Sequence, residues 1–267
     1  MSSEMLPITV LGSGGWIGSA LVADLRRQGI PVKPVDRASL PEWLAGEDRL
    51  GPVIYGIGLT GDFRQQPHAT VEAHVGLLSQ VMQRPGVDQL LFLSSTRVYL
   101  RSADTHETAP LSCLSVEASD LYNLSKLLGE SLVLQDPRPG FKVVRLSNVV
   151  GPGQPANTFV GALLAEARNR GTVMIQQSAD SAKDYVALAD VVRLLPLIAS
   201  DGRQRLYNLG SGRNTSHRQV ADWLERQGLT ARFAMPTAAR HCFPPLVIER
   251  LRAEFELPGD AFLQTDL

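Results

Sequence analysis

The chain has 267 residues, enough for one large domain with a substantial core or for a domain with a small appended cap. Apolar residues make up 44% and charged residues 20%, which excludes disorder over most of the chain. The 26 basic and 27 acidic side chains give a net charge of −1 without a block of like charge, which argues against nucleic-acid or membrane binding through a basic field.

The two cysteines, Cys113 and Cys242, are far apart, and no His or Cys group has metal-ligand spacing, so neither a disulfide framework nor a metal site is expected. No apolar run approaches the ~18 residues of a membrane span. The first residues lack the basic and apolar regions of a signal peptide. We therefore expect a soluble, cytoplasmic protein.

The first half of the chain alternates short β-branched runs with longer helical patterns, which is typical of a doubly wound, Rossmann-like α/β fold with a parallel sheet. The expected strands are Ile8–Leu11, Val32–Asp36, Val53–Gly56, Leu90–Ser94 and Lys142–Leu146. The expected helices are Gly15–Gln28, Ala69–Arg84 and Val116–Gln135. In the last of these, leucines from Leu121 to Leu132 recur at helical spacing and predict an apolar stripe.

The second half begins after a turn-rich break at Gly151–Pro155. The expected elements are helices near Asn157–Arg170, Leu188–Ala199, Ser216–Gln227 and Leu246–Phe255, and strands at Thr172–Gln176 and Arg205–Leu209. Ser216 is the expected cap of its helix. We expect Arg205–Leu209 to return to the main sheet.

Between the first strand and the first helix lies a glycine-rich loop with glycines at 12, 15 and 18. Glycine permits a tight turn and a close approach of the backbone to a pyrophosphate, which is then bound by the N–H groups of a helix N-terminus. The alternative is an ordinary glycine-rich turn, but its position favours a dinucleotide site. The predicted binding residues are Gly12, Gly15, Trp16, Ile17 and Gly18.

We accordingly expect residues 1–150 to form a dinucleotide-binding domain, completed by about 184–210, and residues 151–183 and 211–267 to form a substrate-binding cap.

Asp36 ends the second strand, where a carboxylate can accept hydrogen bonds from both ribose hydroxyls of NAD and repel the 2′-phosphate of NADP. Arg37 could do the opposite by pairing with that phosphate. The sequence therefore favours NAD without excluding NADP.

Tyr122 and Lys126 lie four residues apart, on one face of a predicted helix. A nearby ammonium stabilises a phenolate and lowers the tyrosine pKa, which makes a tyrosine usable in acid–base catalysis. Such a pair alone is usually structural. Here the hydroxyls of Ser94, Ser95 and Thr96 also follow a strand whose carboxyl end is expected to face a ligand crevice.

These motifs together resemble those of the extended short-chain dehydrogenase/reductases, in particular the NAD(P)-dependent nucleotide-sugar epimerases and dehydratases. The resemblance extends from Ile8 to about Gln227. It is carried by the glycine loop, Ser94-Ser95 before Val98-Tyr99, Tyr122-x-x-Ser125-Lys126-x-x-x-Glu130, Val144–Pro152, Lys183–Val191 and Tyr207–Gly210.

The resemblance implies that Tyr122 transfers the proton and that Ser95 hydrogen-bonds the same sugar oxygen. Lys126 would bind the nicotinamide ribose and lower the tyrosine pKa. Asn148 would lie beside the nucleotide sugar, although it is equally typical of a turn. Lys183 stands where the family often has an arginine that pairs with the substrate diphosphate, and a lysine keeps the charge but loses the bidentate fork.

Two departures from the family pattern modify these expectations. Dehydratases of the family carry Asp-Glu directly after the catalytic Ser or Thr, whereas this chain has Thr96 and Arg97, which argues against elimination of water. Only sixteen residues separate Asp36 from Val53, too few for the strand that usually lies there. We therefore expect Val32–Asp36 to be an edge strand, which would also accommodate Pro34.

The sequence predicts an NAD(P)-dependent epimerase or 4-keto-sugar reductase that acts on a nucleotide-diphosphate sugar through Tyr122, Ser95 and Lys126. Cofactor contacts are expected from Ser94, Asp36 and Arg37, and substrate contacts from Thr96, Asn148 and Lys183. The resemblance also implies a homodimer. Two alternatives stay open, namely a reductase of a non-sugar carbonyl and a non-enzymatic dinucleotide sensor.

Overall fold

The chain divides into two compact units, and the computed structural model describes residues 6–59, 61, 63–234 and 243–262 of it. The first unit consists of Met1–Val98, Cys113–Leu146 and Val191–Tyr207. The second consists of Tyr99–Ser112, Ser147–Asp190 and Asn208–Leu267.

The first unit is built on a six-stranded sheet in the order β2-β1-β3-β4-β5-β9. Its strands are β1 (Ile8–Leu11), β2 (Val32–Val35), β3 (Val53–Tyr55), β4 (Leu90–Ser95), β5 (Phe141–Leu146) and β9 (Leu206–Leu209). Every pair from β2 to β5 is parallel. The position of β9 beside β5 confirms that this segment returns to the main sheet.

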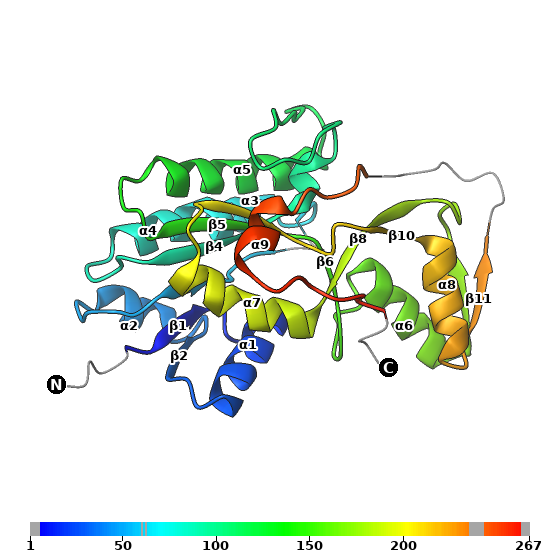
Figure 1. Cartoon of the computed structure of the whole chain (residues 1–267), viewed down its shortest axis with the longest axis horizontal. Helices are drawn as coiled ribbons and strands as arrows, with labels where there is room; N and C mark the ends of the chain where they lie inside the picture. The colour runs from blue at the N-terminus through cyan, green and yellow to red at the C-terminus, as the bar shows by residue number, and fades with distance from the viewer. Residues whose placement is uncertain (1–5, 60, 62, 235–242, 263–267) are drawn as a thin grey trace. The chain divides into compact units, whose positions relative to one another are not determined.

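Helices cover both faces of this sheet, with α3, α4 and α5 on one face and α1 and α7 on the other (Figure 1). The helices are α1 (Trp16–Arg27), α2 (Leu40–Ala45), α3 (Pro67–Val71), α4 (Leu77–Gln83), α5 (Asp120–Gln135) and α7 (Leu188–Asp201). Buried strands carry nearly continuous apolar runs because both faces of a parallel sheet are covered. The predicted doubly wound, Rossmann-like fold is confirmed.

The predicted helix Ala69–Arg84 is interrupted in a way that its sequence pattern does not show. A π-helical turn, Glu72–Gly76, separates α3 from α4. A π turn contains one residue more than an α turn, and such turns occur often at functional sites. It changes the direction of the side chains that follow α3.

Strand β2 lies at one edge of the sheet, as the short interval before β3 predicts. In the described part of the chain, α2 occupies that interval and no strand pairs with the outer side of β2. Pro34 lies opposite Val10 in the register and is exposed. An edge strand tolerates proline because one side of its backbone forms no ladder.

Helix α5 faces the sheet with polar and small residues instead of its leucine stripe. The residues buried on this face include Asn123, Ser125, Lys126, Gly129 and Glu130. By contrast, Leu124 and Leu128 are 38% and 50% exposed. The predicted stripe therefore exists in sequence but lies partly on the outer surface.

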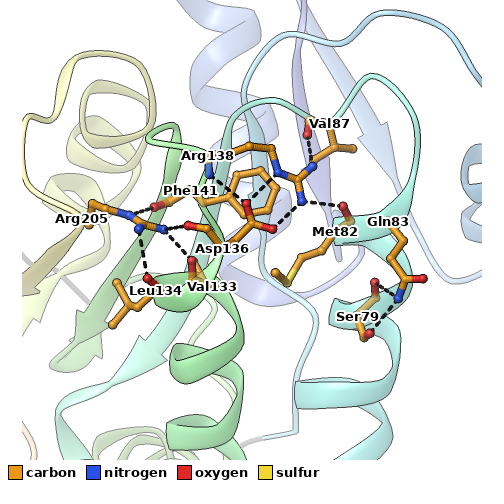
Figure 2. Close-up of polar contacts among 10 residues, drawn as sticks. All are labelled: Ser79, Met82, Gln83, Val87, Val133, Leu134, Asp136, Arg138, Phe141 and Arg205. Atoms are coloured by element: carbon orange, nitrogen blue, oxygen red, sulfur yellow. Dashed lines mark hydrogen bonds and ion pairs between the residues drawn. The ribbon is translucent and has the colours of Figure 1, made fainter.

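The end of α5 is held by the guanidinium group of Arg205 (Figure 2). This group donates hydrogen bonds to the carbonyl oxygens of Val133, Leu134 and Asp136 at 2.7, 3.0 and 2.9 Å, and to that of Phe141 at 3.0 Å. The last carbonyls of a helix have no partner within the helix. Arg205 supplies one, which fixes the end of α5 against the start of β5.

In its described residues, the second unit contains a three-stranded sheet, a two-stranded sheet and several helices. Its elements are β6 (Asn148–Val150), α6 (Phe159–Arg170), β7 (Thr172–Ile175), β8 (Ala182–Ala187), β10 (Asn214–Ser216), α8 (His217–Arg226), β11 (Thr230–Phe233) and α9 (Glu249–Glu254). Strand β8 lies between β10 and β6, and β11 pairs with β7. Ser216 caps α8 in a capping box with Gln219, as predicted.

In the part of the chain that is described, no helix is long and apolar enough to cross a bilayer. Within the same residues, no three or more His, Cys, Asp or Glu side chains form a group that could hold a metal ion. Cys242 lies outside the described residues.

Candidate active site

The glycine loop joins β1 to α1 with a backbone conformation that only glycine adopts easily. Gly12 has a φ of +83°, and its N–H donates to the Val35 carbonyl oxygen at 2.9 Å. A Cβ on Gly12 would lie 2.9 Å from the carbonyl group of Gly56, and one on Gly18 would overlap the carbonyl oxygen of Gly12. The loop thus packs against β3 and α1 without room for side chains.

The N-terminus of α1 carries no capping side chain. Gly15 is the N-cap residue, and Trp16, Ile17 and Gly18 form the first turn. Uncapped N–H groups at the end of a 12-residue helix, behind a tight glycine turn, are the arrangement that binds a pyrophosphate. The five residues predicted for the dinucleotide therefore lie together.

Asp36 follows β2 and lies beside the glycine loop, since a Cβ on Gly14 would be 4.0 Å from its Cβ. Its Oδ1 atom accepts hydrogen bonds from the Ala38 N–H at 3.0 Å and from the N–H and hydroxyl of Ser39, both at 2.9 Å. Hydrogen bonds from Ser39 are the main reason that the pKa of Asp36 is lowered. The exposed carboxylate is therefore ionised at neutral pH, and the neighbouring Arg37 is also exposed.

Tyr122, Lys126 and Ser95 come together where β4 ends against α5. Ser95 is the last residue of β4, and Tyr122 and Lys126 lie one turn apart on α5. The Nζ atom of Lys126 donates to the Leu93 carbonyl oxygen at 2.9 Å and lies 5.9 Å from the centre of the Tyr122 ring. The two side chains are buried, with exposed fractions of 6% for Tyr122 and 5% for Lys126.

Burial raises the pKa of Tyr122, while a hydrogen bond from the Ser95 hydroxyl and the positive charge of Arg97 lower it. Burial also lowers the pKa of Lys126 to about 7, against an opposing effect of Glu130. The ammonium form that would stabilise a Tyr122 phenolate is therefore in balance with the neutral amine near pH 7.

A buried ion pair between Glu130 and Arg145 lies close to Lys126, one helical turn further along α5. The Arg145 guanidinium group donates to both carboxylate oxygens of Glu130, and its shortest bond is 2.6 Å. The hydroxyl of Ser94, a predicted cofactor contact, donates to Glu130 at 2.5 Å. The side chain of Ser94 is therefore directed toward α5, and these contacts join β4, α5 and β5.

Sequence reasoning did not assign a role to His74, which lies in the π-helical turn and is completely buried. Its Nδ1 atom is 2.9 Å from the Ser125 hydroxyl, which itself donates to the Tyr122 carbonyl oxygen. His74 must therefore be the donor, which leaves its Nε2 atom as a bare acceptor. Burial and the charge of Lys126 lower the pKa of His74 to about 2, so the ring is neutral.

The Nε2 atom of His74 has no hydrogen-bond partner among the described residues. A Cβ on Gly58 would lie 2.9 Å from this atom and 3.5 Å from the Nζ atom of Lys126. The His74 ring also meets the Tyr122 ring edge-on, with 5.3 Å between their centres. No sequence signal identifies His74, because the π turn that places it changes the helical period.

The remaining predicted substrate residues are placed as follows. Thr96 begins a 3₁₀ helix, Thr96–Tyr99, directly after Ser95. In the second unit, the Asn148 side-chain amide donates to the Asp184 carbonyl oxygen at 2.9 Å, and Asn148 begins strand β6 instead of a turn. Lys183 lies in β8, with its Nζ atom 4.6 Å from the centre of the Phe159 ring.

The lowered pKa of Lys126 predicts how the stability of the protein depends on pH. An unfolded lysine has a pKa near 10.5, so between that value and about 7 the unfolded chain binds more protons than the folded one. The free energy of unfolding should therefore rise with pH over this range, by up to about 1.4 kcal/mol per pH unit from this group. Lys126→Met should remove that part of the rise. Urea unfolding of the wild-type and Lys126→Met proteins from neutral to alkaline pH measures this difference. If the free energy of unfolding changed with pH in the same way in both proteins, the lowered pKa of Lys126 would be contradicted.

The chain matches the model of the "NAD dependent epimerase/dehydratase family" over residues 56–210. It is 24% identical to a dTDP-6-deoxy-L-talose 4-dehydrogenase (NAD(P)(+)) from Kitasatospora kifunensis over 251 residues, which cover 81% of this chain and 77% of the relative. Among solved structures, MoeE5 in complex with UDP-glucose and NAD is similar with a TM-score of 0.76 and 25% identity, over 95% of this chain and 93% of MoeE5. MoeE5 in complex with UDP-glucuronic acid and NAD gives a TM-score of 0.78 and 24% identity, over 97% of both chains.

The matched segment covers more than half of the chain and includes the end of β4, α5 and β8. It agrees with the predicted fold, with an enzyme of the short-chain dehydrogenase/reductase type and with an NAD(P) cofactor. The resemblance read from the motifs is thereby confirmed: the chain belongs to the NAD dependent epimerase/dehydratase family.

Proposed function

We propose that the protein acts on a nucleotide-diphosphate sugar as an epimerase or as a 4-keto-sugar reductase, by reversible hydride transfer at a sugar hydroxyl or ketone. The observation that carries this proposal is the meeting of Tyr122, Ser95 and Lys126 at the carboxyl end of β4. The two positions that follow Ser95 hold Thr96 and Arg97, and neither can serve as the carboxylate acid and base of an elimination. The nucleotide sugars named for MoeE5 and for the dehydrogenase support this substrate class.

The first unit fits a dinucleotide. The glycine loop and the uncapped start of α1 would hold the pyrophosphate, since a Cβ at Gly12 or Gly18 would fill that cradle. The ionised Asp36 beside the loop would accept hydrogen bonds from the adenosine ribose and would repel a 2′-phosphate, which favours NAD over NADP. A bound nicotinamide dinucleotide would supply the reversible hydride chemistry at the sugar carbon.

Tyr122 supplies the proton chemistry. Its phenolate removes the proton of the sugar hydroxyl as the carbon becomes a ketone, and its phenol returns a proton when the ketone is reduced. The Ser95 hydroxyl donates a hydrogen bond to the phenol oxygen and can contact the sugar oxygen that reacts. The Lys126 ammonium stabilises the phenolate, while the Leu93 carbonyl and the ion pair behind it hold the lysine in place.

Tyr122→Phe should lower turnover by roughly 10² to 10⁴-fold, the usual contribution of a general acid or base, and leave NAD affinity nearly unchanged. Tyr55→Phe is a matched control. It removes another buried phenol hydroxyl of the same unit, which donates to the Ala73 carbonyl oxygen at 2.6 Å, and should reduce stability without abolishing turnover.

Product analysis by NMR distinguishes the two proposed activities: an epimerase inverts a sugar centre without net consumption of NADH, whereas a reductase consumes it. An active Tyr122→Phe variant would refute the mechanism.

Gly18→Ala tests the proposed pyrophosphate site. Its Cβ would overlap the Gly12 carbonyl oxygen, so α1 must move away from the loop and NAD affinity should fall by on the order of tenfold or more. Gly14→Ala is the control, because the nearest atom to its Cβ is 4.0 Å away. Titration with NADH fluorescence compares the two, and equal affinities would argue against binding at this turn.

The exposed side of α5 supports a homodimer. Leu124 and Leu128 lie one turn apart on α5 and are 38% and 50% exposed, and Val71 on α3 is 40% exposed; exposed apolar side chains that are neighbours on a helix are typical of an interface. Leu124→Glu with Leu128→Glu should therefore convert a dimer into a monomer, as measured by sedimentation velocity. Leu197→Glu, at a residue 40% exposed on α7, should not change the mass. A wild-type monomer would contradict the proposal.

A further inference from the structure

A partly buried cation near Tyr122 has so far been given no role beyond lowering the pKa of the phenol. Arg97 lies in the 3₁₀ helix that follows β4, and its backbone N–H donates to the Ser95 hydroxyl oxygen at 3.2 Å. Its guanidinium carbon is 5.6 Å from the centre of the Phe63 ring, which is 5.4 Å from the centre of the Tyr122 ring. Arg97 is thus attached to the same turn as the catalytic hydroxyl and directed toward the same aromatic pair.

The guanidinium group of Arg97 lacks the partners that a partly buried arginine normally has. Its Nη2 atom donates to the Ser119 carbonyl oxygen at 3.3 Å, and its Nε atom is buried without a hydrogen-bond partner in the described chain. Among the described residues, none of the ion pairs found involves Arg97. Asp120 contributes a favourable charge, but its own oxygens accept bonds from the Leu114 N–H and the Asn123 amide.

A second cation increases the excess of positive charge. The guanidinium carbon of Arg64 lies 4.5 Å from the centre of the Phe63 ring, and its charge opposes that of Arg97. Burial and this repulsion both lower the pKa of Arg97. Arg64 is exposed, whereas the Nε donor of Arg97 is buried, and a desolvated cationic donor without a carboxylate partner becomes more favourable once an anion binds.

The position of Arg97 limits which anion this can be. The Tyr122 oxygen and the Ser95 hydroxyl mark the sugar carbon that reacts, so a neighbouring cation meets a group on an adjacent carbon. The diphosphate of a nucleotide sugar is attached at C1, across the ring from C4. A carboxylate at C5 is adjacent to C4, and its planar geometry matches the fork of a guanidinium group.

We propose that Arg97, supported by Arg64 on the Phe63 ring, binds a carboxylate on the carbon next to the reacting centre, and that the substrate is therefore a nucleotide-diphosphate uronic acid. This inference rests on the function proposed above and specifies its substrate class. Arg97 is a specificity-determining residue in this account, and the proton is still transferred by Tyr122.

The test compares acidic and neutral sugar nucleotides on the NAD-loaded protein by isothermal titration calorimetry. The matched pairs are UDP-glucuronate with UDP-glucose and GDP-mannuronate with GDP-mannose. In at least one pair, the wild-type protein should bind the acidic sugar on the order of ten- to a hundredfold more tightly, as expected for a charge-assisted, bidentate bond. Arg97→Gln should abolish this preference and leave the affinity for the neutral sugar within about threefold.

Two further variants complete the test. Arg97→Lys keeps the charge without the fork and should retain part of the preference, which also provides a readout if Arg97→Gln does not fold. Arg168→Gln, at an exposed arginine of α6, should leave the preference unchanged. Equal or tighter binding of the neutral sugars, or a preference that survives Arg97→Gln, would overturn the uronate inference while the nucleotide-sugar function stands. If neither pair binds, both proposals fail.

Discussion

The placement of the candidate active site depends on how α5 is held against β4 and β5. The buried bonds among Ser94, Glu130 and Arg145 join the helix to both strands, and Gly129 lets the helix backbone approach Phe92 closely. A buried ion pair adds little net stability over apolar packing, but the loss of one partner is costly, so it specifies one arrangement. Because Tyr122 and Lys126 precede Glu130 on the same face, this arrangement fixes where the phenol and the ammonium lie.

The same burial that positions these groups makes their protonation sensitive to their neighbours. Water is excluded from Tyr122 and Lys126, so each charge is stabilised only by what the protein or a ligand places beside it. Ser95, Glu130 and the neutral His74 provide dipoles or opposite charge, whereas Arg97 adds a second cation. Lys126 and Arg97 thus both place a positive charge near Tyr122, which would suit a negatively charged ligand.

Much of this arrangement can be predicted from the sequence, for reasons that particular residues make clear. The order of strands and helices follows from periodicity, and the edge position of β2 follows from Pro34 and the short interval before β3. Tyr122, Ser95 and Lys126 can be identified because the strand end and the helix face are local features. His74 could not be assigned, since its position requires a π turn within an otherwise regular pattern. The exposure of Leu124 and Leu128 could not be predicted from the sequence either, because the inner face of α5 packs through Gly129 and buried polar groups.

The edge of the sheet at β2 has a consequence for the behaviour of the protein in concentrated solution. A sheet that ends without a cover offers unpaired backbone groups to other chains, and such edges promote aggregation. Here the outermost strand is only four residues long and includes Pro34, which cannot donate a backbone hydrogen bond. The edge of the sheet at β2 can therefore stay without a further strand, because it is a poor template for pairing with a strand of another molecule.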